Sequence, residues 1–318
     1  MTEARIPLLI DTDPGVDDAL ALLMAFNDMQ SESGRHDVVG LTIVAGNVGL
    51  RHTVANALKL CEVCGVDVPV HAGAETPLVF AARDAAHVHG CDGFGDTGYT
   101  KAARSADSEH AALAILRLSH QYAGTLVLVA LGPLTNLALA LKLDPTLPRR
   151  VARCVVMGAS VTAHGNITPA AEFNIAFDPE AAHIVFSGFP RIELADWEAV
   201  LAHGFLHADI ERWLDADSPR ARFYASISND SRARAKASRG PRWHAADALA
   251  MALALQPGGA LDLMERPLAV ETAGQHARGA TIVDWNRQGG AADNVAILMR
   301  YDQPRFEAML EAALAAGA

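Results

Sequence analysis

The chain has 318 residues, of which 51% are hydrophobic and 20% charged, and its formal net charge is −11. This composition supports a large core, and the acidic balance argues against a nucleic-acid backbone or an anionic membrane surface as the main partner. The four cysteines are few and scattered, no uncharged apolar stretch is long enough to span a bilayer, and the residues around Glu3 do not resemble a signal peptide. We therefore expect a protein of a reducing compartment, most simply the cytoplasm.

Four carboxylates crowd together directly after a short apolar run near the N-terminus: Asp11, Asp13, Asp17 and Asp18. Residues 6–10 are apolar, too few for a helix and followed by the turn pair Pro14-Gly15, which predicts a buried strand. Apolar residues then recur at helical spacing from Ala19. The first two aspartates are therefore predicted at the carboxyl end of a strand and the last two at the start of a helix, where open α/β sheets bind ligands.

This crowding needs a physical reason, because like charges repel and burial removes their hydration. A helix cap accounts for Asp17 or Asp18, since a negative charge is favourable at a helix N-terminus, but it does not account for all four. A hard cation such as calcium or magnesium, bound through oxygen ligands, would offset the repulsion. The stretch therefore predicts a metal site.

Strand and helix patterns alternate through the first two-thirds of the chain, which is typical of a parallel sheet with helical crossovers. Strands are predicted at residues 38–44, 68–70, 125–130, 151–157 and 191–194, with a closing strand at 294–299. No linker or internal repeat divides the sequence. We expect residues 1–318 to form one α/β domain, with a mostly parallel, Rossmann-like central sheet flanked by helices and an active site at the carboxyl ends of its strands.

Two further polar segments follow predicted strands. Asn47 comes just after the strand 38–44, and residues 165–174 hold two asparagines, a glutamate and an aromatic side chain. Amides donate and accept hydrogen bonds and carboxylates accept them strongly, as sugar hydroxyls require. The structural alternative is a polar surface loop before the helix that Asp178-Pro179 is predicted to begin.

Two more candidates lie elsewhere in the chain. Asp247 precedes an apolar helix, where it acts either as an N-cap or as a metal ligand. Residues 71–101 form a long predicted loop that holds His89 among several glycines, a composition that suits a mobile functional loop.

Three of these segments carry a resemblance to one family. Asp-Thr-Asp-Pro-Gly-Val-Asp-Asp-Ala at 11–19 resembles the N-terminal signature of the inosine/uridine-preferring nucleoside hydrolases. Asn-x-Thr-Pro-x-Ala-Glu-Phe-Asn at 166–174 resembles the ribose-binding segment of that family, and Asp247 matches its C-terminal calcium aspartate. The resemblance implies calcium-dependent hydrolysis of the N-glycosidic bond of ribonucleosides, giving ribose and a free base in nucleoside salvage, by a homodimer or homotetramer.

The resemblance also implies a role for each matching residue. Asp13 would be the catalytic base that activates a metal-bound water, and it would ligate Ca²⁺ together with Asp18, Asp247 and the backbone carbonyl of Leu131. The implied substrate contacts are Asp17, Asn47, Met157, Asn166, Glu172, Phe173 and Asn174. Asp11 would orient the cluster from behind the ligands.

The sequence departs from the family pattern beside Asp247. Many pyrimidine-specific or broad-specificity members have a histidine directly before this aspartate as leaving-group acid, whereas this chain has Ala246. His244, three residues before Asp247, and His89 in the long loop are the candidates for a leaving-group acid or a base contact.

The arginine-rich stretch 220–239 is typical of a solvated helical face. The resemblance places this region over the base-binding side of the site. Phe223 and Tyr224 are therefore candidates for stacking on the nucleobase, and Trp243 either stacks there or packs.

Two other classes of function stay open. A ribonucleoside-binding protein without turnover would fit if Ala246 reflects lost leaving-group chemistry. An aspartate-dependent phosphatase would fit the Asp-x-Asp pattern at a strand end, but Asp13 is followed by Pro-Gly-Val-Asp-Asp and not by the Gly-Thr expected there.

Overall fold

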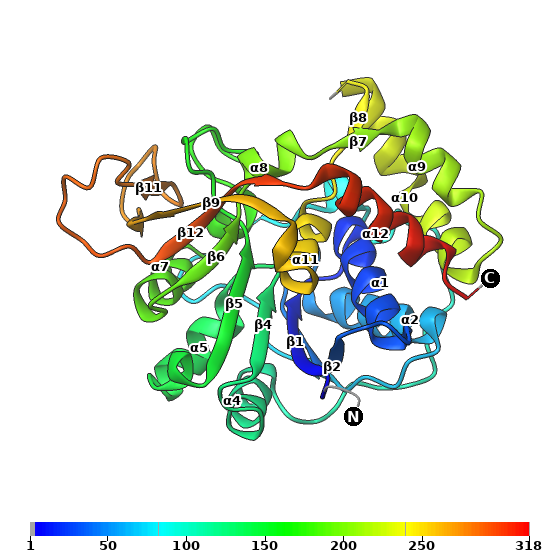
Figure 1. Cartoon of the computed structure of the whole chain (residues 1–318), viewed down its shortest axis with the longest axis horizontal. Coiled ribbons are helices and arrows are strands. Elements are labelled where there is room, and N and C mark those ends of the chain that lie inside the picture. The colour runs from blue at the N-terminus through cyan, green and yellow to red at the C-terminus, as the bar shows by residue number, and fades with distance from the viewer. Residues whose placement is uncertain (1–3, 82, 239, 318) are drawn as a thin grey trace.

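An eight-stranded sheet runs through the centre of the computed structural model, which describes residues 4–81, 83–238 and 240–317 (Figure 1). The strand order is β3-β2-β1-β4-β5-β6-β12-β9. Neighbouring strands pair in parallel except β9, which is antiparallel to β12. The strands are β1 (Ile6–Thr12), β2 (His36–Ile43), β3 (Val70–Ala72), β4 (Leu126–Ala130), β5 (Val151–Met157), β6 (Ile192–Ala195), β12 (Val295–Tyr301) and β9 (Ala260–Arg266).

Helices cover both faces of this sheet. One face packs against α1 (Val16–Gln30), α11 (Ala246–Leu255) and α12 (Gln303–Ala315), and α2 (Leu50–Cys64) and α10 (Pro219–Ser238) lie beside α1. The other face packs against α4 (Ala111–Gln121), α5 (Thr135–Leu143) and α7 (Pro179–Gly188). Because side chains alternate along a strand, Leu8 and Ile10 of β1 join the first core and Leu9 joins the second.

The strand order reverses between β1 and β4. The helix after β1 packs on one face of the sheet and the helix after β4 packs on the other, so the loops that follow these two strands diverge and leave a crevice. The stretch from Asp11 to Asp18 and the turn at Leu131 border this crevice. The predicted α/β class and mostly parallel sheet are confirmed.

Shorter elements lie between and beside the main helices and strands. They are α3 (Ala86–His89), α6 (Phe173–Phe177), α8 (Trp197–Ala202), α9 (His207–Leu214), the antiparallel pair β7 (Phe205–Leu206) with β8 (Arg242–Trp243), and the antiparallel pair β10 (Leu268–Val270) with β11 (Thr281–Val283). Two short 3₁₀ helices, Leu147–Arg149 and Pro257–Gly259, complete the set. Within the part of the chain that is described, no helix has the length and apolar character needed to cross a bilayer.

Several predicted boundaries are corrected. The strand expected at 68–70 is β3 at 70–72, and the stretch 71–101 contains the short helix α3. The strand β9 was not predicted, because Leu, Asp, Met, Glu and Arg at 261–266 have low strand propensity and only pairing with the distant β12 orders them. That pairing also puts β12 inside the sheet, so the predicted closing strand does not form its edge.

Candidate active site

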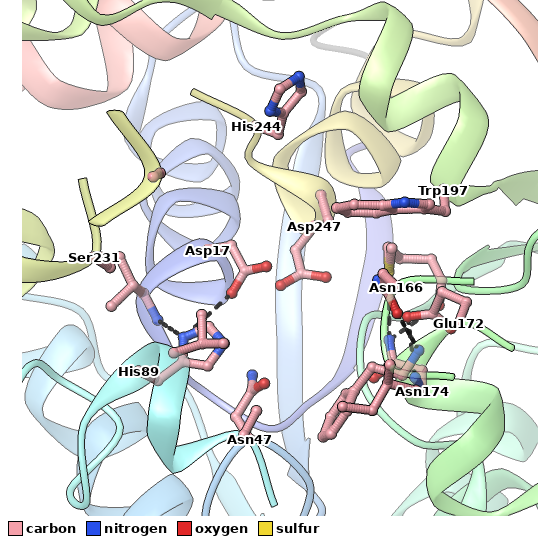
Figure 2. A pocket seen from close by; sticks show the side chains of 18 of the residues that line it. Asp17, Asn47, His89, Asn166, Glu172, Asn174, Trp197, Ser231, His244 and Asp247 are labelled. Atoms are coloured by element: carbon pink, nitrogen blue, oxygen red, sulfur yellow. Dashed lines mark hydrogen bonds and ion pairs between the residues drawn. The ribbon is translucent and has the colours of Figure 1, made fainter. Parts of the chain in front are cut away.

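A cavity of about 300 Å³ opens at the carboxyl ends of the central strands (Figure 2). The loops after β1, β2, β4 and β5, the start of α11 and one side of α10 enclose it. Of the predicted site residues, the cavity is lined by Asp17, Asn47, His89, Leu131, Met157, Asn166, Glu172, Phe173, Asn174, His244 and Asp247. The structure therefore brings together residues that are up to 230 positions apart in the sequence, from Asp17 to Asp247.

Asp13 lies beneath this cavity, 1% exposed. The backbone N–H of Asn47 donates to its Oδ2 at 2.7 Å. A Cβ atom added at Gly46 or Gly132 would fall 2.1 Å or 2.3 Å from a carboxylate oxygen of Asp13, so only glycine fits at either position. Burial and the neighbouring charge of Asp18 hold the pKa of Asp13 well above its usual range.

Asp18 organises the loop between β1 and α1. Its carboxylate accepts four hydrogen bonds from that loop and its neighbour, donated by Thr12 Oγ1 (2.5 Å), Asp13 N (3.3 Å), Gly15 N (3.0 Å) and Asn47 Nδ2 (2.9 Å). The bond from Gly15 is the capping interaction of α1, so the capping alternative is correct for this aspartate. Asp18 is nonetheless fully buried beside other carboxylates, and burial followed by the charge of Asp17 raises its pKa.

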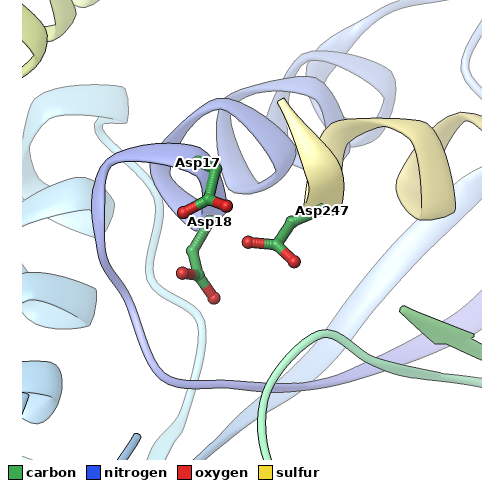
Figure 3. A group of neighbouring side chains, drawn as sticks. All are labelled: Asp17, Asp18 and Asp247. Carbon is green, nitrogen blue, oxygen red and sulfur yellow. The ribbon is translucent and has the colours of Figure 1, made fainter. Parts of the chain in front are cut away.

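Asp17, Asp18 and Asp247 converge on one point (Figure 3). Each offers a carboxylate oxygen, and these three oxygens lie within 4.8 Å of one another. Burial and then the charges of Asp18 and Asp17 hold the pKa of Asp247 well above its usual range. Asp247 is the second residue of α11, whose cap is Ala245, so the capping alternative is wrong for this residue. A cluster of acidic oxygens is the donor set that a hard cation takes.

The predicted ligand set and this cluster overlap only in part. Asp17, predicted to contact the substrate, belongs to the cluster, and Asp13 lies outside it. Leu131 lines the cavity, and its carbonyl oxygen accepts a hydrogen bond from Asn174 Nδ2 at 2.7 Å. A carbonyl oxygen has a second lone pair, so this bond leaves it able to bind a further partner.

Asp11 is fully buried at the end of β1 and binds residues of the neighbouring loops. Its Oδ2 accepts hydrogen bonds from Thr42 Oγ1 at 2.7 Å and Asn136 Nδ2 at 2.9 Å, and its backbone carbonyl accepts from Leu131 N at 2.8 Å. Complete burial raises its pKa to about 7. Asp11 therefore fixes the turn at Leu131 and does not line the cavity.

The segment 166–174 forms one wall of the cavity. Glu172 caps α6: its carboxylate accepts three backbone N–H groups, of Ala159 at 3.0 Å, Asn174 at 3.0 Å and Ile175 at 3.2 Å. Burial raises the pKa of Glu172 to about 7 against these bonds. Residues 171–174 are therefore a built part of the site, whereas residues 166–169 form an exposed loop at its rim, as the structural alternative predicted.

The other members of this wall are tied together as well. The side-chain carbonyl of Asn166 accepts the N–H of Phe173 at 2.8 Å. Asn174 Nδ2 also approaches the carbonyl oxygen and the sulfur of Met157, both at 3.3 Å. The ring of Phe173 packs on Phe177 with centroids 6.0 Å apart and faces the cavity with its other side.

The two histidine candidates occupy different positions. His89 Nδ1 accepts the N–H of Val16 at 3.1 Å and lies 3.8 Å from Asp17 Oδ1, so the ring is held over the start of α1. In Figure 2 the imidazole of His244 is directed away from Asp247. Its Nε2 packs against Gly204, where an added Cβ would come within 2.6 Å. His89 is therefore the histidine that faces the carboxylate cluster.

The aromatic predictions for α10 are wrong. Tyr224 is fully buried and Phe223 packs against Phe94 and Tyr99, with centroids 5.7 Å and 6.2 Å apart, so neither lines the cavity. The helix turns a different face to the cavity, which was not predicted: Ser231, Arg234, Ala235 and Ser238. Residues three or four positions apart lie on one face of a helix, so the sequence contained a signal for this face. The many arginines in the stretch favoured its interpretation as a solvated face instead. Arg239, the last residue of the predicted stretch, lies outside the described residues.

Two tryptophans complete the lining. Trp243 is 6% exposed, packs against His207 and also lines the cavity, so the packing alternative is confirmed and stacking on the nucleobase stays a prediction. Trp197, the first residue of α8, was not predicted to line the site. Its position depends on how α8 docks after β6, which local sequence does not reveal.

Comparisons with known proteins agree with this geometry. A family model described as inosine-uridine preferring nucleoside hydrolase matches residues 8–308. The non-specific ribonucleoside hydrolase RihC of Salmonella newport is 36% identical over 303 residues, 95% of each chain. The solved plant nucleoside hydrolase PpNRh1 matches with a TM-score of 0.90 at 30% identity, covering 98% of this chain and 99% of its own. A solved inosine-guanosine nucleoside hydrolase gives a TM-score of 0.88 at 30% identity, covering 97% and 98%.

The chain belongs to the inosine-uridine preferring nucleoside hydrolase family. It is thus an enzyme of the class that hydrolyses N-glycosidic bonds of ribonucleosides, and the resemblance drawn from its three motifs is confirmed. The phosphatase alternative is set aside by the same match.

Proposed function

We propose that this enzyme hydrolyses ribonucleosides to ribose and a free purine or pyrimidine base in a calcium-dependent reaction, with Asp13 as the general base. The observation that carries the proposal is the buried group of carboxylates at the switch point of the sheet, opposite a wall of amides and a carboxylate suited to sugar hydroxyls. The names of the relatives indicate different preferences for the nucleobase, since one is a non-specific hydrolase and another an inosine-guanosine hydrolase. We therefore propose no narrower preference for this enzyme.

The residues of the carboxylate cluster fit a calcium ion. Their oxygens are hard donors within 4.8 Å of one another, and the raised pKa values of Asp18 and Asp247 record repulsion that a cation would relieve. We propose that Asp13, Asp18, Asp247 and the Leu131 carbonyl hold the ion and that Asp17 contributes beside them. When bound, the ion would supply positive charge that lowers the pKa of a coordinated water molecule.

Asp13 is suited to removing a proton from the attacking water. Its raised pKa makes its carboxylate a stronger base than an exposed aspartate, and glycines 46 and 132 hold it in one place. Asp17 and Asn47 would orient hydroxyls of the ribose, and Asn166, Glu172 and Asn174 would bind the rest of the sugar, with Met157 and Phe173 beside it. Fixed carboxylates near the sugar also stabilise the positive charge that develops on its ring as the bond breaks.

The departing base needs a partner because Ala246 cannot donate a proton. Since His89 Nδ1 accepts the Val16 N–H, a neutral His89 ring carries its proton on Nε2 and acts as a donor from that atom. We propose His89 ahead of His244 for this contact, because His89 faces the cluster and His244 is directed away from it in Figure 2.

The test is release of free ribose from inosine, uridine, adenosine, cytidine and p-nitrophenyl riboside, each with calcium, with chelator, and with Asp13→Ala. We expect turnover that chelator and Asp13→Ala both abolish. Cleavage of the nitrophenyl riboside alone would mean that the base lacks a partner on the enzyme, since that leaving group needs no acid. Nucleoside binding without ribose release from any compound would overturn the proposal and support a binding protein.

We further propose a cytoplasmic homodimer or homotetramer acting in nucleoside salvage. Cys61, Cys64, Cys91 and Cys154 are free thiols, as a reducing compartment would maintain them. Light scattering coupled to size-exclusion chromatography would measure the number of subunits, and a monomer would contradict the assembly.

A further inference from the structure

Trp197 has a fixed position at the rim of the cavity. It is the first residue of α8, a helix capped by Asp196, whose side chain accepts the N–H of Ala199 at 2.9 Å. The backbone N–H of Trp197 donates to the carbonyl of Ala159 at 3.0 Å. One side of the partly buried indole packs on the core, and another lines the cavity. In Figure 2 the ring extends from α8 over the side that holds Asn166 and Glu172.

The indole and the Glu172 carboxylate are held relative to each other through Ala159. This residue has a φ of +72°, a conformation that non-glycine residues rarely adopt, and it is fully buried. Its N–H donates to Glu172 Oε2 at 3.0 Å while its carbonyl accepts from Trp197. A strained residue that is clamped from both sides fixes the distance between the two groups it joins.

A second clamp keeps α8 against the same loop. The carboxylate of Glu198 accepts hydrogen bonds from Ser160 Oγ at 2.9 Å, Val161 N at 3.0 Å and Thr162 N at 2.8 Å. Trp197 is therefore anchored through its own backbone, its cap and its neighbour in sequence. These contacts fix the backbone from which the partly buried indole extends to the rim of the cavity.

The shape of a ribonucleoside decides what this indole faces. The 2′ and 3′ hydroxyls lie on one face of the sugar ring, and the base and C5′ project from the other. With the 2′ and 3′ hydroxyls held by Asp17 and Asn47, as proposed above, C5′ must lie along a side wall. The segment 166–174 supplies the remaining sugar contacts, which puts C5′ near Asn166, Glu172 and the indole of Trp197.

We propose that Trp197 is a specificity-determining residue that closes the 5′ end of the sugar subsite and restricts the enzyme to ribonucleosides with an unextended 5′-hydroxymethyl group. This inference rests on the proposed function. A neutral 5′ extension such as a methylthio group collides with the indole. A 5′-phosphate meets the indole and also the carboxylate of Glu172, which repels its charge.

The two extensions respond differently to removal of the indole. Trp197→Ala makes room, so the neutral methylthio riboside becomes a better substrate. The same variant leaves Glu172 in place, so the 5′-phosphate stays rejected. This separation distinguishes a steric wall at Trp197 from a general loosening of the site.

The experiment measures kcat/KM of the calcium-loaded enzyme for uridine, 5′-deoxy-5′-methylthiouridine and uridine 5′-monophosphate, with the inosine series in parallel. We expect Trp197→Ala to raise the ratio of methylthio riboside to parent by about tenfold or more, the usual scale of discrimination by a small apolar group. The monophosphate ratio should stay within the error of wild type. Trp285→Ala is the matched control, a partly buried tryptophan that does not line the cavity.

The outcomes separate this inference from the proposed function. If wild type does not cleave either parent, the proposed function fails and Trp197 is not the cause. If the parent is cleaved and the methylthio ratio is unchanged in Trp197→Ala, or rises equally in Trp285→Ala, the role of Trp197 is overturned. If Trp197→Ala does not fold, a series of 5′-alkylthio chain lengths on wild type decides: a steep fall at the first member supports the wall, and a flat series contradicts it.

Discussion

Buried carboxylates at two places in this molecule, one in the central sheet and one beside the ends of its strands, differ in how their charge is balanced. Glu193 on β6 is 7% exposed, and Arg153 grips it with two hydrogen bonds of 3.1 Å and 2.6 Å while Arg191 adds one of 3.0 Å. Burial favours its neutral form, but the arginines outweigh burial and lower its pKa. Asp13, Asp18 and Asp247 are as deeply buried, and burial together with the charge of neighbouring carboxylates raises their pKa values.

The comparison shows that this fold buries carboxylates with like charge together at the candidate active site, whereas it pairs a buried carboxylate with arginines elsewhere. At Glu193 the charges pair, and Arg153 also holds the end of α11 by donating to the carbonyls of Leu253 and Ala254. At the switch point the carboxylates cost stability in the absence of a cation, because repulsion adds to desolvation. Glu193 supports the scaffold, whereas the carboxylates at the switch point are suited to binding a cation and substrate.

The largest expected effect is at Asp247. Asp247→Asn should lower kcat by about 10²-fold or more, because it removes a proposed calcium ligand. The same change should raise the free energy of unfolding in chelator by about 1 kcal/mol, the equivalent of one pKa unit, since one of the repelling charges is gone. Steady-state kinetics and urea unfolding with chelator measure the two.

The melting temperatures of wild type and Asp247→Asn, measured with and without calcium, test the same account. Calcium should raise the melting temperature of wild type by mass action and leave Asp247→Asn almost unchanged. A melting temperature of Asp247→Asn in chelator below that of wild type would contradict the account of repulsion.

Gly132→Ala tests whether activity requires the observed position of the Asp13 carboxylate. The new methyl group would fall 2.3 Å from Asp13 Oδ1, so the carboxylate or the turn must move, and we expect destabilisation by about 1–3 kcal/mol and most of the activity lost. Gly49→Ala is the control, because no atom lies within 4 Å of its added Cβ. Equal activity in the two variants, measured beside their thermal melts, would show that Asp13 does not need its observed position.

Glu193→Gln tests the paired carboxylate. We expect a loss of about 1–3 kcal/mol of unfolding free energy at pH 7, since hydrogen bonds to a charged group are replaced by weaker ones. A lowered folded-state pKa gives stability that is present above the unfolded value of 4.5 and is lost as the pH falls through the folded value. The difference between wild type and Glu193→Gln should therefore shrink below pH 4.5. A difference that stays constant from pH 7 to pH 3 would contradict the pairing argument.

The smallest effect on activity is expected for substitution of Arg234, which links α10 to α3 at the cavity. Its Nη2 donates to the carbonyl of Val88 at 2.8 Å, next to His89. Arg234→Met should raise KM about fivefold with kcat nearly unchanged, because one exposed hydrogen bond that positions the loop is lost. Arg222→Met, on the same helix but outside the cavity, is the control and should leave KM as it is.

The local sequence was sufficient for most of the parallel strands and for the acidic and amide segments. Residues 151–157 were predicted as a strand and form β5 with those bounds, because the apolar run 154–157 is the buried part of a parallel strand that ends at a turn. Asp11 to Asp18 and residues 166–174 were predicted as polar segments after strands, and both border the cavity or lie directly beneath it. Parallel strands bring such segments to one edge of the sheet, so a pattern read along the chain also predicts that they meet.

Tertiary structure alone decided the rest. Asp17 and not Asp13 joins the cluster of Asp18 and Asp247, because the rotation of α1 and α11 sets which oxygens converge. Trp197 and Arg234 reach the cavity through the docking of α8 and α10, and β9 forms only on β12. These placements depend on contacts between distant segments, whereas periodicity and motif spacing report only local geometry and which residues share a face.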